Sequence, residues 1–304
     1  MNSKANSIKS AIADFMVKRG IPGEMEQNLI KEAIHLHLLS ALSDAGVLRH
    51  VVFQGGTALR LCYGGERYSE DLDFVCGKAG SYVDKIEFDG VVQNALETAK
   101  KSLHRDFDID PNQIMLKQPK HPMAIKGGSV SIAAWQISVP IGPNPPLPKS
   151  RIKIEFANVP SYDNGPNVAK AMQGLVQIQD VILKTESANE ILADKAVALT
   201  ARQALKYRDV WDVWYLTNKL NAQADRSIVA SKFRDYGTLD VETRAKQRRD
   251  ELGKSSTEKL FLDEMRRFLP AKRVTEMTEA GLHRTILAAS GKLIASVVLP
   301  IPAK

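Results

Sequence analysis

Residues 51–61 read VVFQGGTALRL, and residues 71–75 read DLDFV. The first stretch begins as a short apolar run, passes two glycines and a threonine, and continues in good helix formers. It predicts a strand, a glycine turn and the start of a helix. The second stretch alternates acidic and apolar residues before Cys76 and Gly77, which predicts a strand with one anionic and one buried face.

Asp71 and Asp73 lie on the anionic face of this second predicted strand. Two carboxylates this close repel each other unless cations lie between them, and Mg²⁺ commonly takes one or two carboxylates together with substrate phosphates. The pair predicts a site for Mg²⁺, or Mn²⁺, that serves phosphoryl or nucleotidyl transfer. A solvated strand end is the alternative for the tripeptide alone, and the context favours the metal site.

That context is the turn formed by Gly55, Gly56 and Thr57, 14 residues upstream of Asp71. At a strand-to-helix junction, uncovered backbone N–H groups and the helix dipole can hold the phosphates of a nucleoside triphosphate. A third carboxylate comes from RIKIEF, residues 151–156, another predicted strand. If it neighbours the Asp71 strand, Glu155 can complete a metal site or act as a general base. An exposed polar strand face is the alternative.

Other periodic segments extend this half of the chain. Helices are expected at residues 24–46 and 88–105, and strands at residues 129–139 and 151–156. His35 and His37 lie on different faces of the first helix, so they predict ordinary helix histidines. The proline-rich residues 140–150 predict an exposed loop joining two strands.

The signal changes to helix at Ser187, where Ser187-x-x-Glu190 forms a predicted capping box. We expect two domains, residues 1–184 and residues 185–304, because 304 residues exceed the usual size of a single core. The fold class is therefore an α+β domain followed by an all-helical domain. Further helices are predicted at residues 207–220, 225–236, 240–253, 256–269 and 276–297, and a strand at residues 297–301.

The net charge of +7 is uneven, with 25 Lys/Arg against 19 Asp/Glu in residues 151–304. A basic second half suits an RNA partner, although basic helical domains without one are common. Within an exposed helix we expect Arg244, Lys246, Arg248 and Arg249 to contact RNA phosphates. A solvated basic helix face is the alternative.

The chain has no run of roughly 20 apolar residues, and its first 20 residues hold no continuous apolar segment. A cytoplasmic protein without a membrane partner is expected. Cys62 and Cys76 are expected to be reduced, since two cysteines make neither a disulfide framework nor a zinc site. With no coiled-coil seam, a monomer is expected.

The motifs around the glycine turn and the paired aspartates resemble the AbiEii/AbiGii nucleotidyltransferase toxin family. Residues 54–61, Tyr63-Gly64 and Arg67-x-Ser69-x-Asp71-Leu72-Asp73-Phe74 are similar to its first motif. Lys153-Ile154-Glu155 is similar to its second motif. Leu192-Ala193-Asp194-Lys195, with Ala198, Leu199 and Arg202, is similar to its third, and Arg208-Asp209-x-x-Asp212 to its fourth. Order and spacing agree over residues 50–216.

The resemblance implies a DNA polymerase β-like catalytic domain, a helical carboxy-terminal domain, and NTP and Mg²⁺ as ligands. Members act as toxins of type IV toxin–antitoxin pairs, and some are linked to phage defence by abortive infection. Some resemble the mycobacterial MenT toxins, which add nucleotides to the 3′ end of transfer RNA. A winged-helix antitoxin encoded beside the toxin is implied as a genetic partner, with no direct binding expected.

Carried over to this sequence, the resemblance assigns catalysis to Ser69, Asp71, Lys195 and one of Asp209 or Asp212. It also places Arg67 and Ser69 at the nucleotide. Lys195 would hold triphosphate oxygens as a point charge. Asp209 and Asp212 share a helix face, where they would anchor Lys195, Arg208 or a ribose. Trp211 and Trp214 are expected in the core rather than stacked on a base.

The sequence thus predicts transfer of a nucleoside monophosphate from an NTP to an RNA acceptor, with the 3′ end of transfer RNA the expected site. Two alternatives remain open. The acceptor would be a protein hydroxyl in the first, and in the second the chain would be a non-catalytic RNA-binding module.

Overall fold

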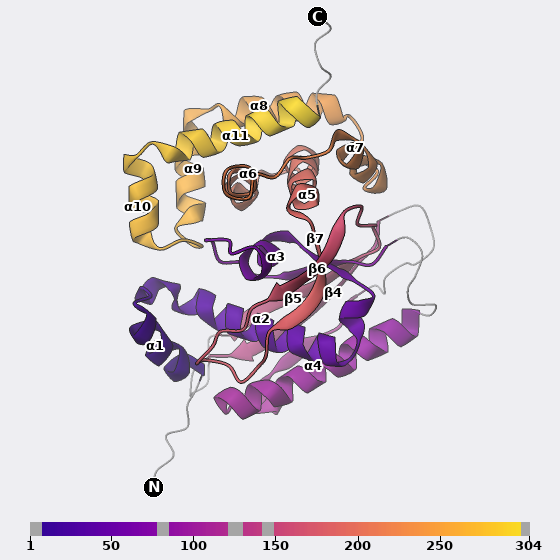
Figure 1. The fold of residues 1–304 in the computed structure, drawn as a ribbon, viewed down its shortest axis with the longest axis vertical. Coiled ribbons are helices and arrows are strands. Elements are labelled where there is room, and N and C mark those ends of the chain that lie inside the picture. Colours follow the sequence, from indigo (N-terminus) through magenta and orange to yellow (C-terminus); the bar gives the residue numbers. More distant parts are fainter. Residues whose placement is uncertain (1–7, 78–84, 121–129, 142–148, 299–304) are drawn as a thin grey trace, which may run out of the picture. The chain divides into compact units, whose positions relative to one another are not determined.

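The computed structural model describes residues 8–77, 85–120, 130–141 and 149–298 (Figure 1). The chain divides into two compact units. Among the described residues, the first unit comprises residues 8–77, 85–120, 131–141, 149–160 and 165–185, and the second comprises residues 130, 161–164 and 186–298. The chain passes from the first unit to the second for the last time between Thr185 and Glu186, one residue after the boundary predicted from the sequence.

The first unit contains a seven-stranded mixed sheet with the strand order β3-β4-β5-β2-β1-β7-β6. Strand β2 pairs antiparallel with β1 and parallel with β5, so it lies at the centre of the sheet. The predicted α+β class of this half, with a mixed sheet and helices, is confirmed. The strands are β1 Val52–Gln54, β2 Leu72–Val75, β3 Met115–Lys117, β4 Ile132–Pro140, β5 Lys149–Ala157, β6 Asn164–Ala169 and β7 Val181–Glu186.

In the described part of this unit, the α-helices that accompany the sheet are α1 Ile8–Arg19, α2 Glu26–Asp44, α3 Gly55–Cys62 and α4 Lys85–Phe107. Helix α2 packs against α4 and β5, and these elements lie side by side in Figure 1. The buried face of the central strands supplies an aromatic core. Phe74 stacks on Phe156 with ring centroids 5.0 Å apart, and Trp135 meets Phe156 edge-on at 5.6 Å. The buried apolar face leaves Asp73 and Glu155 on the opposite face.

Both histidines of α2 are buried and hydrogen-bonded, as ordinary helix histidines are. His35 Nε2 lies 3.0 Å from the Glu70 carbonyl oxygen, and His37 Nδ1 lies 2.6 Å from Ser102 Oγ. Burial lowers the pKa of each imidazole to about 4. Both histidines are therefore neutral at pH 7.

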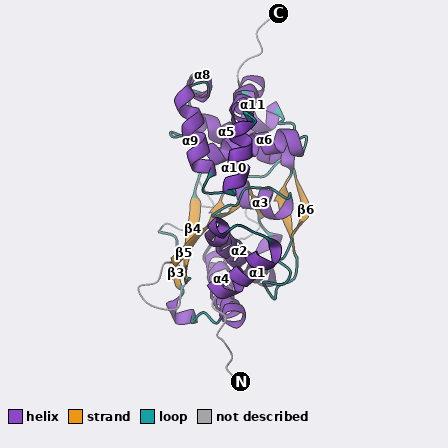
Figure 2. Ribbon diagram, turned by 90° about the vertical axis from the view of Figure 1, so that its left-hand side faces the viewer, coloured by secondary structure: helices purple, strands orange, loops and turns teal. Residues whose placement is uncertain are grey.

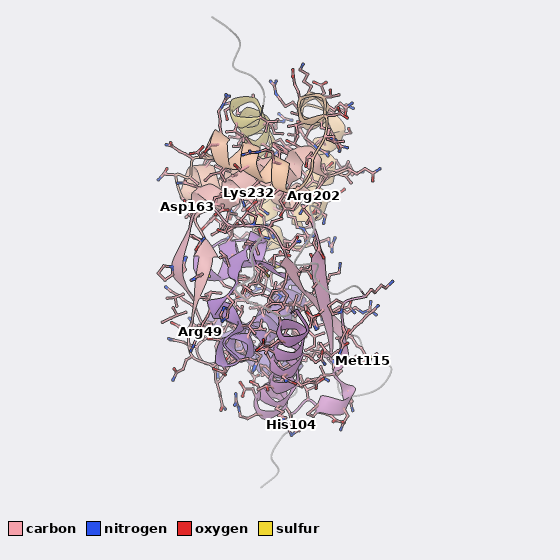
Figure 3. The ribbon with its side chains drawn as sticks, turned by 90° about the vertical axis from the view of Figure 1, so that its right-hand side faces the viewer. Arg49, His104, Met115, Asp163, Arg202 and Lys232 are labelled. Carbon is pink, nitrogen blue, oxygen red and sulfur yellow. The ribbon has the colours of Figure 1, made fainter. Side chains whose placement is uncertain are left out.

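Acid is expected to destabilise the first unit through these histidines. Because their pKa values are lowered, the unfolded chain binds the extra protons, and stability falls as pH drops from 6.5 toward 4. A shift of this size is worth about 3 kcal/mol for each histidine. Urea unfolding across this range should show a weaker pH dependence for His37→Gln. His104→Gln, which removes an exposed imidazole of α4 (Figure 3), should behave as wild type.

The second unit is built from helices, which Figure 2 shows in purple. Helix α5 begins after Ser187, whose hydroxyl accepts a hydrogen bond from the Glu190 backbone N–H at 3.1 Å, so the predicted cap is present. The helices are α5 Ala188–Ala201, α6 Tyr207–Lys219, α7 Arg226–Asp235, α8 Val241–Leu252, α9 Ser255–Met265, α10 Ala271–Glu279 and α11 Leu282–Val297. No helix in the described ranges is long and apolar enough to cross a membrane.

Some sequence predictions of elements are wrong. Residues 276–297 form two helices instead of one, because Gly281 adopts φ +63° between α10 and α11. Val297 ends α11 rather than starting a strand, and residues 299–301 of that predicted strand lie outside the described residues. Most of the proline-rich loop, residues 142–148, also lies outside them. The two expected strands on either side of that loop, β4 and β5, are present, and they pair antiparallel.

Candidate functional site

The candidate site of the first unit lies where β1 passes into α3. Helix α3 begins at Gly55 itself, so the two glycines are its first residues rather than a separate turn. Gly55 adopts φ +79°, a conformation that only glycine reaches without strain. The preceding Gln54 makes no side-chain cap to the first amides of the helix. The first backbone N–H groups of α3 therefore receive no hydrogen bond from the Gln54 side chain.

Polar side chains approach both glycines closely enough to exclude any larger residue. A Cβ atom on Gly55 would lie 2.8 Å from Asp73 Oδ2. On Gly56 it would lie 2.9 Å from Ser69 Oγ and 3.1 Å from the guanidinium carbon of Arg67. One carboxylate thus lies against the first residue of α3, and one guanidinium and one hydroxyl lie against the second. The sequence predicted each of these residues, and the structure brings them together.

The carboxylates come from adjacent strands. In the parallel pairing of β2 with β5, Asp73 and Glu155 are register partners, as Leu72 and Ile154 are. The predicted neighbourhood of the two strands is confirmed. Adjacent strands lie about 4.8 Å apart, and like charges at opposite positions repel. Such a pair is costly unless a cation lies near it.

Asp71, one residue before β2, is fixed by backbone contacts. Its Oδ1 accepts a hydrogen bond from the Lys153 backbone N–H at 3.1 Å, and its carbonyl oxygen accepts one from the Thr57 hydroxyl at 2.5 Å. No hydrogen bond to Asp71 Oδ2 is found in the part of the chain that the structure describes. One carboxylate oxygen is thus used for positioning, and the other is available to a ligand.

The side chain of Thr57 has a positioning role. Thr57 is 1% exposed, and its hydroxyl donates to the backbone of Asp71. It therefore helps to position the strand that carries the aspartates. Nucleotide binding by Thr57, which was predicted for the backbone N–H groups of this segment, stays a prediction.

The carboxylates fit a hard divalent cation by their chemistry, since all their donors are oxygen. Among the described residues, no group of three or more Asp, Glu, His or Cys side chains is arranged to hold a metal ion. Asp71 and Asp73 would therefore need oxygen atoms from a bound phosphate to complete the coordination, which is the usual arrangement for Mg²⁺. Glu155 as a third ligand stays a prediction, and Lys153 Nζ lies 3.8 Å from its Oε1.

Replacing Gly56 by Ala is expected to disturb this site. The added Cβ would displace the buried Arg67, which is 4% exposed, and the hydroxyl of Ser69. We expect a loss of about 1–3 kcal/mol in stability and a weaker affinity for nucleotide. Gly90→Ala is the matched control, because its Cβ would meet nothing within 4 Å on helix α4. Thermal unfolding and nucleotide titration of both variants would check this, and equal behaviour of the two would contradict it.

The second unit holds the other predicted catalytic residues in a cluster of their own. Lys195 Nζ on α5 lies 2.7 Å from Asp209 Oδ1 and 2.8 Å from Asp212 Oδ2, both on α6. Arg202 also pairs with Asp209. Anchoring Lys195, one of the three roles considered for the aspartates, is therefore present. Lys195 is 7% exposed, and its contact with a triphosphate stays a prediction.

Of the four residues of α8 that were predicted to contact RNA, three are exposed and one is buried. Arg248 is buried, and its guanidinium donates to the carbonyl oxygens of Leu199 at 2.7 Å and Arg202 at 2.6 Å. It joins helices rather than facing solvent, so its assignment to RNA is wrong. The sequence prediction overlooked that Arg248 is three positions after Ala245, so that both lie on the buried face of α8. Arg244, Lys246 and Arg249 are exposed.

Trp211 and Trp214 are buried, as expected for core residues, with ring centroids 5.1 Å apart.

Cys62 and Cys76 are free thiols, each half-buried. Burial raises the pKa of Cys62 to about 11 and that of Cys76 to about 12, so neither is a thiolate at pH 7. The reduced state of both cysteines stays a prediction.

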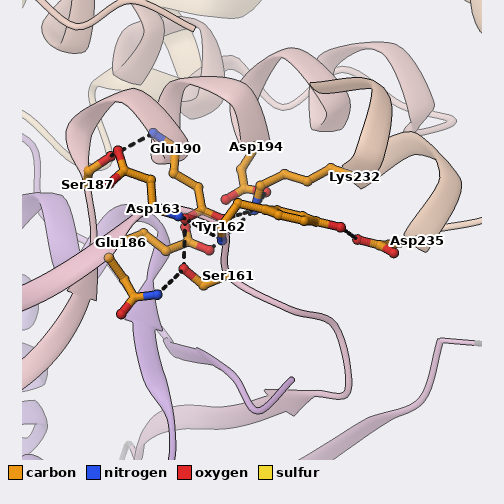
Figure 4. Close-up of polar contacts among 10 residues, drawn as sticks. Ser161, Tyr162, Asp163, Glu186, Ser187, Glu190, Asp194, Lys232 and Asp235 are labelled. Carbon is orange, nitrogen blue, oxygen red and sulfur yellow. Dashed lines mark hydrogen bonds and ion pairs between the residues drawn. The ribbon is translucent and has the colours of Figure 1, made fainter. Parts of the chain in front are cut away.

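A cluster that the sequence did not predict surrounds Lys232 of α7 (Figure 4). Its Nζ lies 3.3 Å from Glu186 Oε1, 2.8 Å from Glu190 Oε1 and 2.7 Å from Asp194 Oδ1. Glu190 also accepts hydrogen bonds from the backbone N–H groups of Tyr162 and Asp163. Spacing gave part of the signal, because Glu190 and Asp194 are four apart on α5 and share a face, whereas Glu186 ends strand β7.

Comparison with known proteins matches most of the chain to one family. A family model described as "Nucleotidyl transferase AbiEii toxin, Type IV TA system" matches residues 37–281. JHP933 from Helicobacter pylori is similar in structure with 19% identity and a TM-score of 0.41, over 90% of this chain and 92% of that one. A candidate nucleotidyltransferase from H. pylori has 21% identity and a TM-score of 0.45, over 88% and 95%. No curated protein matches in sequence.

Proposed function

The chain belongs to the AbiEii family of nucleotidyl transferase toxins, and from this premise we propose that it transfers a nucleoside monophosphate from an NTP to an RNA. The proposed acceptor is the 3′ end of a transfer RNA. The observation that carries the proposal is the meeting of Gly55 and Gly56 with Asp73, Arg67 and Ser69. It places anion-binding groups directly beside carboxylates.

The phosphates would bind at the amino-terminal end of α3. Backbone N–H groups there attract anions, and the lack of a Cβ at Gly56 lets Arg67 and Ser69 reach this end of the helix. Arg67 would add a positive charge and Ser69 a hydrogen bond. The buried position of Arg67 strengthens its attraction for a phosphate, because the local dielectric constant is lower than that of water.

Asp71 and Asp73 would hold the divalent cation. When bound, Mg²⁺ would offset the negative charge that develops on the phosphate oxygens. Asp71 keeps its orientation because Oδ1 is tied to the Lys153 backbone N–H. Asp73 and Glu155 oppose each other in register, and Lys153 near Glu155 supplies one positive charge against their two negative charges, so a divalent cation would be attracted there.

In the proposed reaction an acceptor hydroxyl oxygen attacks the α-phosphorus of the NTP. The bond from the α-phosphorus to the bridging oxygen breaks, and pyrophosphate leaves with that electron pair. The proton of the hydroxyl passes to a carboxylate, for which Glu155 is the proposed base. The helix N-terminus and Arg67 stabilise the charge of the transition state.

The test is incubation of the purified protein with each α-³²P-labelled NTP, Mg²⁺ and total RNA, followed by a denaturing gel. The proposal expects label in an RNA of transfer-RNA size. Label that survives nuclease treatment in a protein band would contradict the RNA acceptor and establish a protein acceptor. No label in any band would contradict transfer and favour a non-catalytic module. On the same premise, a neighbouring gene is proposed to encode a winged-helix antitoxin.

A further inference from the structure

The second unit contains a groove of about 540 Å³ with a mixed basic and apolar lining. It lies between the carboxy-terminal turn of α8, the turn into α9 and one face of α11. Leu252, Leu287, Ala288 and Ala295 supply the apolar part of the lining. The groove is formed entirely by residues of this unit.

Three cations of this groove have no ion-pair or side-chain hydrogen-bond partner among the described residues. They are Arg249 of α8, Lys254 between α8 and α9, and Lys292 of α11, and all three are exposed. A fourth cation, Arg284, is neutralised by Glu258 at 3.1 Å. Asp250 is the remaining acidic residue of the lining, so the groove carries more positive than negative charge.

Other cations nearby are engaged differently. Lys246 pairs with Glu242 at 2.8 Å, and the Arg244 guanidinium donates to the Ala201 carbonyl oxygen at 3.1 Å. Lys272 lies 3.9 Å from Glu276. Arg249, Lys254 and Lys292 differ from these neighbours, because among the described residues they have no ion-pair partner and they line the same groove. Residues 241–297 carry 12 Lys/Arg against eight Asp/Glu, so the surrounding potential is also positive.

The groove is open where α11 borders it. A Cβ atom on Gly291 would meet nothing within 4 Å, so there is empty space above the helix backbone. Gly291 is next to Lys292, and both line the groove. A ligand can therefore approach the α11 backbone closely with a cation beside it.

We propose that this groove binds the sugar-phosphate backbone of the RNA acceptor. The inference rests on the proposed function, and it names where the second unit meets that substrate. Cations supplied by three separate elements fit a polymer with several phosphates better than a single small anion. The contact would add affinity without selecting a base sequence. It keeps Arg249 from the RNA contacts expected of α8 and adds Lys254 and Lys292 to them.

A single substitution tests the groove with a matched control. Gly291→Glu places a carboxylate in the empty space, and Gly291→Gln places an uncharged side chain of nearly the same size there. Both replace a helix glycine, so both should fold at least as well as wild type. We expect Gly291→Glu to bind fluorescein-labelled transfer RNA about tenfold more weakly than Gly291→Gln at low salt.

A second comparison removes charge without adding bulk. The groove triple variant Arg249→Gln/Lys254→Gln/Lys292→Gln is set against the control Lys219→Gln/Lys259→Gln/Lys272→Gln, which removes three exposed charges elsewhere. For single-stranded contacts, the slope of log affinity against log salt should fall by about 0.7 for each lost phosphate contact. The groove triple should show a fall of about 2 and the control little change.

The outcomes separate the groove from the proposed function. Weaker binding by both groove variants, with their controls near wild type, supports the inference. If wild type binds and labels RNA while the groove variants match their controls, the groove assignment is overturned and the function stands. If wild type neither binds nor labels RNA, the RNA acceptor itself fails and the groove assignment fails with it.

Discussion

Asp71→Asn is expected to lower the rate of nucleotidyl transfer by roughly 10³-fold while leaving the melting temperature near that of wild type. The amide oxygen of Asn can still accept the hydrogen bond from the Lys153 backbone N–H, so the strand entry keeps its geometry. What the variant loses is the negative charge that would hold a cation. This substitution therefore tests the negative charge of Asp71 separately from the position of its side chain.

The measurement is single-turnover transfer of labelled nucleotide together with thermal unfolding. Asp108→Asn is the control, since Asp108 is exposed and its φ of +53° suits Asn. It should retain full activity. More than a tenth of wild-type activity in Asp71→Asn would contradict a metal-binding role. A large fall in its melting temperature would instead assign Asp71 a structural role.

Lys232→Met is expected to destabilise the second unit by about 3–5 kcal/mol. Burial opposes the charge of Lys232, but Asp194, Glu186 and Glu190 together raise its pKa above the ordinary lysine value. Removing the cation leaves these carboxylates buried against one another. Burial and the neighbouring Asp194 already raise the pKa of Glu186 well above its usual range, so this carboxyl is the first to take up a proton.

The deficit of Lys232→Met should depend on pH in a defined direction. Without the lysine, the buried carboxylates have raised pKa values, so their protonated forms favour folding at low pH and that stability is lost as pH rises. The deficit should be smaller at pH 5 than at pH 8, as measured by urea unfolding. Lys246→Met is the control, and its exposed pair with Glu242 should be worth less than about 0.5 kcal/mol. A deficit below about 1 kcal/mol would contradict the account of the cluster.

The parts of the site that the sequence predicted are those set by local pattern. Alternation along residues 71–75 and 151–156 placed Asp73 and Glu155 on the polar face, and their pairing in register follows once the strands are neighbours. The glycines were recognised from a strand-to-helix junction. Local pattern also identified the cap at Ser187.

The parts that were missed depend on contacts between distant segments. Lys232 meets Glu186 across 46 residues, and Arg248 meets the Leu199 carbonyl oxygen across 49. A basic helix segment does not reveal which of its side chains turns inward. Helix α1 and strands β6 and β7 were likewise not predicted; β7 pairs with β1 from far along the chain, an arrangement that sequence periodicity does not reveal.

The most direct test of the central claim is equilibrium binding of an NTP whose α,β-bridging oxygen is replaced by methylene. Titrations would compare wild type and Asp71→Asn with Mg²⁺ and with EDTA. We predict binding by wild type that requires Mg²⁺, and binding at least tenfold weaker in Asp71→Asn. Equal affinity in all four titrations would contradict a carboxylate-held cation as the basis of nucleotide binding.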